Sequence, residues 1–347
     1  MSAIVGIIVK SYPFSTRKKY SGMLRRFILL MVVLASLIGC STVAPTTQST
    51  DIVVGMPYIP NVQFAYFYVA AQKGYFADAG FNVTFDYNFE NDVVQRIATN
   101  NQIQFALASA DSILLARAQG MPVRAVMATS QEFPVAFISK QATPLQGPAD
   151  LVGATVGIPG RFGASYIGLQ ALLYAGGLTE SDVNIQEVGF AQVAALSEDR
   201  VAIVSGYANN EPIQLAAQGV PVNVLRVADV YPMASDHLIV NEKLISDQPA
   251  VVAAFVGALQ KGMNDVIADP KAAHDIALTY IPEAKQGDPA ITLQVLEATA
   301  AMWQANTDVL GRIQPDAWQK SAELLQSIGA LTQPADLSAA YDLSFIK

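Results

Sequence analysis

The chain has 347 residues, of which 52% are hydrophobic and 14% are charged, and its formal net charge is −8. Its first 39 residues carry six basic side chains and no acidic one, so the remainder holds 15 basic against 29 acidic residues, a net charge near −14. This acidic body excludes nucleic acid as a partner, because such binding needs a basic surface. The single cysteine excludes disulfides within the chain and metal sites built from several thiolates, and only two histidines could supply imidazole ligands. We therefore predict neither a metal nor a cofactor.

The N-terminal segment is typical of an export signal. Arg25 and Arg26 precede an apolar run of 13 residues, 27–39, which ends in small residues before Cys40. A transmembrane helix would need roughly 20 apolar residues. The tetrapeptide 37–40, Leu-Ile-Gly-Cys, resembles a bacterial lipobox, whose cysteine receives a diacylglycerol thioether. We therefore predict a signal peptide at 1–39 and a lipidated tether at 40–50. The alternative for Cys40 is a small buried side chain.

The resemblance of residues 37–40 to a lipobox implies a lipoprotein that carries palmitate. Its lipid anchor would hold it on the outer face of the cell membrane. The translation start could be Met1 or Met23, because residues 1–22 add nothing that a signal requires.

After the tether, short apolar runs alternate with helical patterns. The first series predicts strands at 52–56, 81–87, 105–108 and 123–127, and helices at 64–72, 92–99 and 109–119. A stretch rich in turn residues, 139–148, predicts a linker. The second series predicts strands at 154–158, 184–188, 201–204 and 222–225, and helices at 163–175, 192–196 and 211–218. Strand–helix units of this length predict parallel-rich sheets flanked by helices.

The C-terminal third is predicted to be helical, at 251–267, 270–280, 291–303, 315–328 and 335–340. Because it adds no new sheet, we expect it to pack on the first series. The predicted body is an α/β protein of two lobes, one formed by 51–138 plus 238–347 and the other by 139–237. Two crossing segments would join the lobes and leave a cleft between them.

Binding sites in such bodies lie at the carboxyl ends of strands and at helix N-termini. The loops at these positions are rich in aromatic rings and uncharged amides, and Arg161 is their one obvious cation. Each ring could instead be ordinary core, and Arg161 a solvated loop residue. The predicted ligand contacts are Tyr58, Asn61, Gln63, Phe64, Asn88, Phe89, Ser109, Asp111, Glu132, Phe133, Arg161, Phe162, Tyr166, Tyr207, Asn210 and Glu211.

The sequence shows no catalytic constellation: it contains no GxSxG, HExxH or Cys–His arrangement. His237 and His274 have no ligand-spaced partners, and each is interpreted as a structural or surface side chain. An enzyme on this scaffold remains the alternative, which a cluster of either histidine with carboxylates in the cleft would support. A receptor domain that feeds a signalling partner is a further alternative, although no output module is present.

Three motifs carry a family resemblance. The segment 60–83, with "YVA", "KGYF" and "AG" followed by Asn82-Val83, resembles the substrate-binding proteins of ABC importers for sulfonates and vitamin precursors. The segments 115–123 and 206–212 resemble the same family, and the similarity covers about residues 51–240. It implies a two-lobe periplasmic-binding-protein fold of type II, with the ligand between the lobes, and delivery to a permease and its ATPase. The family also contains enzymes that make the thiamine pyrimidine, but those carry a cysteine-rich segment that this chain lacks.

The resemblance leaves the ligand open among riboflavin, the thiamine pyrimidine precursor and a sulfonate. A sulfonate needs convergent cations or hydroxyls, whereas these loops supply rings that could stack on a three-ring system. We therefore expect a flat heterocyclic vitamin, with riboflavin first. Closure of the lobes is expected to use hinges near 139–144 and 231–237.

Overall fold

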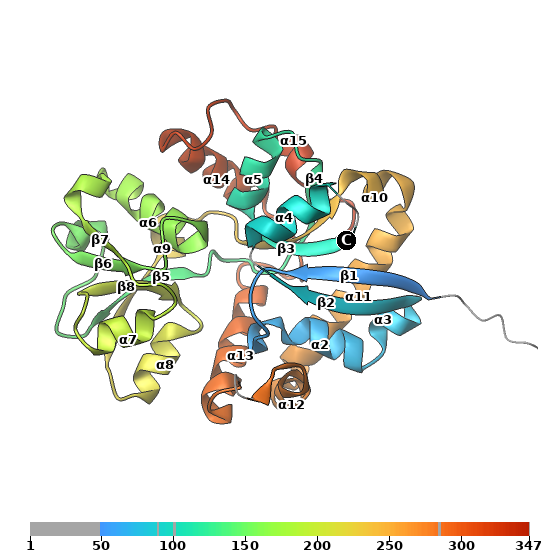
Figure 1. The fold of residues 1–347 in the computed structure, drawn as a ribbon, viewed down its shortest axis with the longest axis horizontal. Helices are drawn as coiled ribbons and strands as arrows, with labels where there is room; N and C mark the ends of the chain where they lie inside the picture. Colours follow the sequence, from blue (N-terminus) through green and yellow to red (C-terminus); the bar gives the residue numbers. More distant parts are fainter. Residues whose placement is uncertain (1–48, 89, 100–101, 284–285, 347) are drawn as a thin grey trace, which may run out of the picture. The chain divides into compact units, whose positions relative to one another are not determined.

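The computed structural model describes residues 49–88, 90–99, 102–283 and 286–346 (Figure 1). The predicted signal peptide, Cys40, most of the tether and Phe89 lie outside these ranges. Within them the chain forms two five-stranded sheets. We call the sheet formed by the first strands, with its helices, the first lobe, and the other sheet with its helices the second lobe.

The first-lobe sheet has the order β2-β1-β3-β10-β4. Its strands are β1 (Thr50–Met56), β2 (Phe81–Tyr87), β3 (Phe105–Ser109), β4 (Val123–Ala128) and β10 (Asp236–Asn241). The second-lobe sheet has the order β7-β6-β8-β5-β9, with β5 (Val135–Lys140), β6 (Thr155–Ile158), β7 (Asn184–Glu187), β8 (Ile203–Tyr207) and β9 (Val222–Arg226). In each sheet one strand, β10 or β5, runs antiparallel to both neighbours, and the other pairs are parallel.

Helices cover both faces of each sheet (Figure 1). The first lobe contains α2 (Ala65–Gln72), α3 (Tyr75–Asp78), α4 (Glu90–Thr99), α5 (Ala110–Ala118), α10 (Glu242–Asp247), α11 (Pro249–Ala268), α12 (Pro270–Tyr280), α13 (Pro289–Gln304), α14 (Pro315–Ser327) and α15 (Leu337–Ala340). The second lobe contains α6 (Gly163–Gly176), α7 (Gln192–Ser197), α8 (Glu211–Ala217) and α9 (Val227–Val230). The C-terminal helices pack back on the first lobe, as the sequence predicts.

Helix α11 is long and apolar enough to cross a membrane by length and composition alone. It is nevertheless a core helix, because Phe255, Leu259 and Met263 are buried and it packs against α2. The two helices approach closely at Gly262, where an added Cβ would lie 2.2 Å from the backbone oxygen of Tyr66. A small residue at this position therefore sets the distance between α11 and α2.

The two antiparallel strands were not predicted. Both lie inside their sheets, β5 between β8 and β9 and β10 between β3 and β4, and most of their residues are buried. A strand that is buried on both faces shows no apolar–polar alternation, so its local pattern is ambiguous. Strand β5 occupies the start of the stretch interpreted as a linker, and the boundary predicted after residue 138 therefore falls inside it.

The chain crosses between the lobes at 129–134 and again at 231–235, and both segments are held by the C-terminal helices. In the first, the backbone N–H of Gln131 donates to Met302 and its side chain accepts from Gln314. In the second, the backbone N–H of Ala234 donates to Ser321. The hinge predicted at 139–144 is wrong, because these residues begin in β5 and do not connect the lobes. The one predicted at 231–237 coincides with the second crossing.

Candidate functional site

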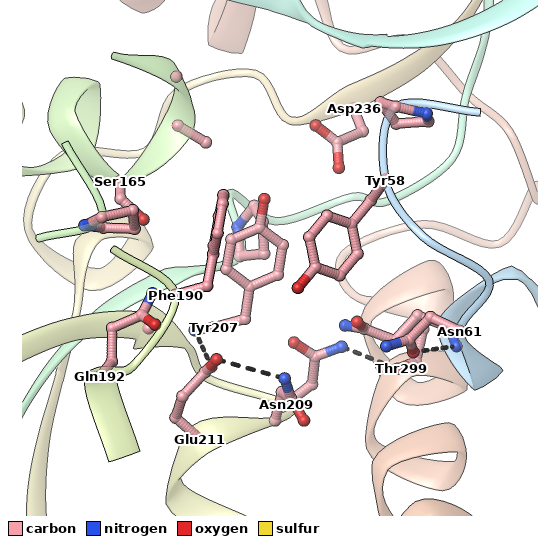
Figure 2. A pocket seen from close by; sticks show the side chains of 18 of the residues that line it. Tyr58, Asn61, Ser165, Phe190, Gln192, Tyr207, Asn209, Glu211, Asp236 and Thr299 are labelled. Atoms are coloured by element: carbon pink, nitrogen blue, oxygen red, sulfur yellow. Dashed lines mark hydrogen bonds between the residues drawn. The ribbon is translucent and has the colours of Figure 1, made fainter. Parts of the chain in front are cut away.

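A cavity of about 1000 Å³ lies between the two lobes (Figure 2). The loops after β1, β6, β7 and β8 contribute to its wall, together with the end of β3, the start of β10 and one face of α13. The parallel strands point their carboxyl ends at the interlobe edge. Antiparallel β10 runs the other way, so its first residue, Asp236, reaches the same edge. The volume is at the upper end of the range for small-molecule sites.

Aromatic rings from both lobes face this cavity. Tyr58 follows β1 in the first lobe. In the second lobe, Phe162 and Phe190 come from loops, and Tyr207 is the last residue of β8. The rings of Tyr58 and Phe190 lie 5.8 Å apart between centroids and are tilted by 56°. Phe162 and Phe190 are 55% and 59% exposed, although both are large and apolar. Exposed apolar groups gathered in a concavity are typical of a ligand site.

Uncharged amides line the same cavity, and several have their orientation set by hydrogen bonds. The side-chain oxygen of Asn61 accepts from the backbone N–H of Gln63 at 3.0 Å, which leaves the Asn61 amino group for other partners. The amide nitrogen of Gln214 donates to the side-chain oxygen of Asn210 at 2.8 Å. Gln192 also lines the cavity and is 8% exposed. Amides of this kind match a heterocycle edge that carries both donors and acceptors.

Asn209 connects the two lobes. Its amide nitrogen donates to the hydroxyl of Thr299 on α13 at 2.7 Å, and Asn209 is only 4% exposed. Its side-chain oxygen is buried and has no hydrogen-bond partner among the described residues. Leaving a buried polar atom unpaired costs about 1–3 kcal/mol. The site therefore contains an acceptor whose partner is absent from the described chain.

Glu211, the first residue of α8, adds an ionisable group. Its carboxylate accepts from the backbone N–H of Tyr207 at 2.6 Å, and burial raises the pKa of the carboxyl above its ordinary value. The side chain folds over Gly206, where an added Cβ would lie 2.9 Å from it. Burial, followed by the Glu211 charge, raises the pKa of Tyr58 as well. Tyr58 therefore stays a neutral hydroxyl near neutral pH.

Among the described residues, the cavity wall contains no lysine, arginine or histidine. Arg161 lies on the surface and forms ion pairs with Glu180 and Glu187 instead. The acidic side chains of Glu198, Glu211 and Asp236 do line the cavity. The arrangement suits a neutral ligand with hydrogen-bonding edges better than an anion, which would need compensating positive charge. The described residues contain no group of three or more His, Cys, Asp or Glu that could hold a metal ion.

The structure brings many of the predicted ligand residues to the cavity. The predicted residues that line it are Tyr58, Asn61, Gln63, Phe64, Ser109, Phe162, Tyr207, Asn210 and Glu211. The predicted residues that do not line it are Asn88, Asp111, Glu132, Phe133, Arg161 and Tyr166. Phe89 lies outside the described residues.

The predicted residues that do not line the cavity either bind other side chains or lie elsewhere in the fold. Tyr166 donates to Glu180 at 2.5 Å, the carboxylate that also pairs with Arg161, so both side chains turn away from the cavity. Glu132 pairs with Arg226, and Phe133 is buried in the core. Asp111 is buried in the first turn of α5, while Asn88 is exposed.

Other lining residues were not predicted. Thr299, Met302 and Trp303 lie on α13, about 240 residues after the first loop of the site, and nothing local marks them as ligand contacts. Phe190 could have been found, because its loop follows a predicted strand just as the chosen loops do. Asn209 stands in a motif that the sequence singled out, but its neighbours Asn210 and Glu211 were chosen instead.

The chain is similar to known proteins over most of its length. It is 47% identical over 310 residues to "Riboflavin-binding protein RibY" of Chloroflexus aurantiacus, covering 87% of this chain and 88% of that protein. It is 29% identical over 269 residues to "Formylaminopyrimidine-binding protein" of Halalkalibacterium halodurans, covering 75% of this chain and 80% of that protein. Both relatives are named as binding proteins.

Solved structures show the same fold. The periplasmic aliphatic sulphonate binding protein SsuA of Escherichia coli superposes with a TM-score of 0.66 at 12% identity, covering 83% of this chain and 96% of that one. The two-lobe α/β periplasmic-binding-protein fold expected from the sequence is thereby confirmed. The sequence profile described as "NMT1/THI5 like" matches residues 61–273. With that match and the 47% identical relative, the chain belongs to the NMT1/THI5-like family.

Proposed function

We propose that this protein is the extracytoplasmic solute-binding component of an ABC importer and that its solute is riboflavin. The observation that carries the proposal is a ring-lined interlobe cavity free of cationic side chains among the described residues, in a chain 47% identical to a protein named as riboflavin-binding. The two observations are needed together, because the relative does not reveal this chain's contacts and the cavity does not identify a vitamin.

The chemistry of riboflavin matches the wall of the cavity. Its flat three-ring system is uncharged at neutral pH and offers two faces for stacking on Tyr58, Phe190 or Tyr207. Its carbonyl and N–H edge and its hydroxylated side chain suit the amides of Asn61 and Gln192. A formylaminopyrimidine has a single ring and would leave much of a cavity of about 1000 Å³ unfilled. A sulfonate would find no cationic partner in the described wall.

The proposed mechanism is capture by closure. The ligand enters between the lobes, which rotate about the crossings at 129–134 and 231–235 and cover it from both sides. The closed protein then presents one joint surface to the permease subunit, whose ATPase drives release and transport. The lipid on Cys40 would hold the protein at the outer face of the cell membrane, close to this partner.

We infer that the protein binds its ligand without converting it. His237 and His274 lie outside the cavity wall and have structural partners. His237 contacts the backbone oxygen of Ser235 and accepts from Trp318, and His274 bonds to Thr292. The two relatives that are named as binding proteins support this inference.

The proposal is tested by titrating the purified protein with riboflavin and following the quenching of flavin fluorescence. We expect saturable quenching with one site per chain and a Kd in the micromolar range or tighter. Formylaminopyrimidine and an alkanesulfonate serve as competitors, and neither should displace riboflavin at equal concentration. Tight sulfonate binding without flavin binding would contradict the ligand and leave the class of protein intact.

A further inference from the structure

Asn209 has an amide whose orientation is determined by its neighbour. The hydroxyl of Thr299 donates its single proton to the backbone oxygen of Val295 at 2.6 Å. Thr299 can therefore only accept from Asn209, so the amide nitrogen must face Thr299 at 2.7 Å. The side-chain oxygen of Asn209 is thereby turned to the other side and cannot exchange places with the nitrogen.

The side-chain oxygen of Asn209 is a hydrogen-bond acceptor that receives no donor in the structure as described. It is buried without a hydrogen-bond partner among the described residues, and the side chain belongs to the cavity wall. Figure 2 shows the Asn209 amide bordering the part of the cavity into which the Tyr58 hydroxyl points. Protein atoms cover the oxygen in this structure, so a ligand group must displace them to reach it.

We propose that the side-chain oxygen of Asn209 is the specificity-determining acceptor for the ring N–H of the bound heterocycle. This inference rests on the proposed function and adds to it the atom that recognises the flavin edge. The riboflavin ring system carries one N–H, flanked by two carbonyls. Because the same amide also binds Thr299 of the other lobe, recognition of this N–H and closure of the cleft use one side chain.

The test compares riboflavin with 3-methylriboflavin, which lacks the ring N–H, by fluorescence quenching on the same purified protein. A site built to pair a polar group strongly rejects an analogue that lacks the group, so we expect binding of the methylated flavin to be weaker by about tenfold or more. A flavin altered elsewhere on the ring, 5-deazariboflavin, keeps this N–H and should bind within about threefold of riboflavin.

Variants separate hydrogen bonding from steric exclusion of the methyl group. Asn209→Leu keeps the approximate volume and removes both the acceptor and the bond to Thr299. Both flavins should therefore bind more weakly, and the preference for riboflavin over the methylated flavin should fall by about tenfold. Thr299→Val frees the amide to flip and should reduce the preference for riboflavin, whereas Thr299→Ser keeps the hydroxyl and should preserve it. Thermal unfolding of each variant confirms that it folds.

The outcomes are distinct. If riboflavin binds and the methylated flavin binds equally well to the unaltered protein, the role of Asn209 is overturned and the proposed function stands. If Asn209→Leu retains the full preference, exclusion of the methyl group is steric and the role is again overturned. If riboflavin does not bind at all, the proposed function fails and this inference fails with it.

Discussion

Tyr58 of the first lobe and Phe190 of the second lobe bring their rings within 5.8 Å across the interlobe cavity (Figure 2). Tyr58 follows β1 and Phe190 follows β7, so the two meet only because the lobes face each other. A flat ligand that enters must separate them, and each ring then offers it one face. This relationship makes the two rings the most direct test of stacking.

Replacing Phe190 by alanine is expected to weaken riboflavin binding by about 10- to 100-fold, since stacking on an aromatic side chain contributes about 1–3 kcal/mol per ring. Because Phe190 is 59% exposed, the substitution should leave the unfolding temperature nearly unchanged. Fluorescence quenching gives the affinity, and thermal unfolding gives the stability.

A control for Phe190 is Leu343→Ala. Leu343 is also large, apolar and exposed (51%), and it does not line the cavity. Its removal should leave riboflavin affinity within about twofold, as expected for a surface site away from the ligand. Equal losses in the two variants would argue against a specific stacking role for Phe190.

Arg161→Gln should leave ligand affinity within about twofold, because surface substitutions away from a site usually have small effects. The guanidinium pairs with Glu180 on the surface and does not line the cavity. Titration of the variant at low and high salt checks both affinity and its ionic-strength dependence. A loss of affinity of tenfold or more would show that Arg161 reaches the ligand and that the cavity takes an anion.

Gly262→Ala is expected to destabilise the protein by about 3 kcal/mol, at the upper end of the cost of overpacking a core. The new methyl group would meet the backbone oxygen of Tyr66 at 2.2 Å, and backbone cannot rotate away as a flexible side chain does. Gly257→Ala on the same helix is the control, because an added Cβ there meets no atom within 4 Å. It should stabilise the protein by roughly 0.5–1 kcal/mol. Urea unfolding of the two variants should therefore shift in opposite directions.

Stability should fall as pH drops from neutral, and His237 should account for part of the loss. Burial lowers the pKa of His237 from 6.5 to about 4, outweighing the backbone hydrogen bond at Ser235. Below pH 6.5 the unfolded chain therefore binds a proton that the folded chain resists. The stability that this neutral histidine provides is complete above pH 6.5 and is lost progressively down to about pH 4.

His237→Gln isolates this contribution, because glutamine can accept from Trp318 and donate to Ser235 without titrating. Between pH 7.5 and 5 the unaltered protein should lose about 2 kcal/mol more than the variant, at about 1.4 kcal/mol per pH unit below the unfolded pKa. Urea unfolding at the two pH values measures the difference. Identical losses would mean that His237 titrates alike in the folded and unfolded chains. His274, whose pKa is also lowered, contributes equally to both proteins.

Cys40→Ser should release the protein from the membrane fraction. The predicted lipobox depends on the thiol, because the thioether to diacylglycerol forms at sulfur and a hydroxyl does not replace it. Fractionation of expressing cells, with labelled palmitate as tracer, should find the unaltered protein labelled and sedimenting and the variant unlabelled. A labelled variant would contradict the anchor at Cys40.

The sequence by itself determined those features that depend on local pattern. Alternating strand and helix signals predicted the two α/β series, and the loops chosen after predicted strands included Tyr58, Asn61 and Tyr207, which line the cavity. The motif at 60–83 indicated the family from one continuous stretch of chain. These inferences succeed because periodicity, turn residues and loop chemistry are encoded within a few neighbouring residues.

Tertiary structure alone decided the rest. Strands β5 and β10 are antiparallel members of otherwise parallel sheets, and their pairing depends on partners far away in the chain. Glu180 turns Arg161 and Tyr166 away from the cavity, and α13 brings Thr299 to Asn209 across 90 residues. The direction of a side chain and the packing of a remote helix depend on free energies summed over the whole fold, so local pattern could supply the chemistry of the cavity but not its complete wall.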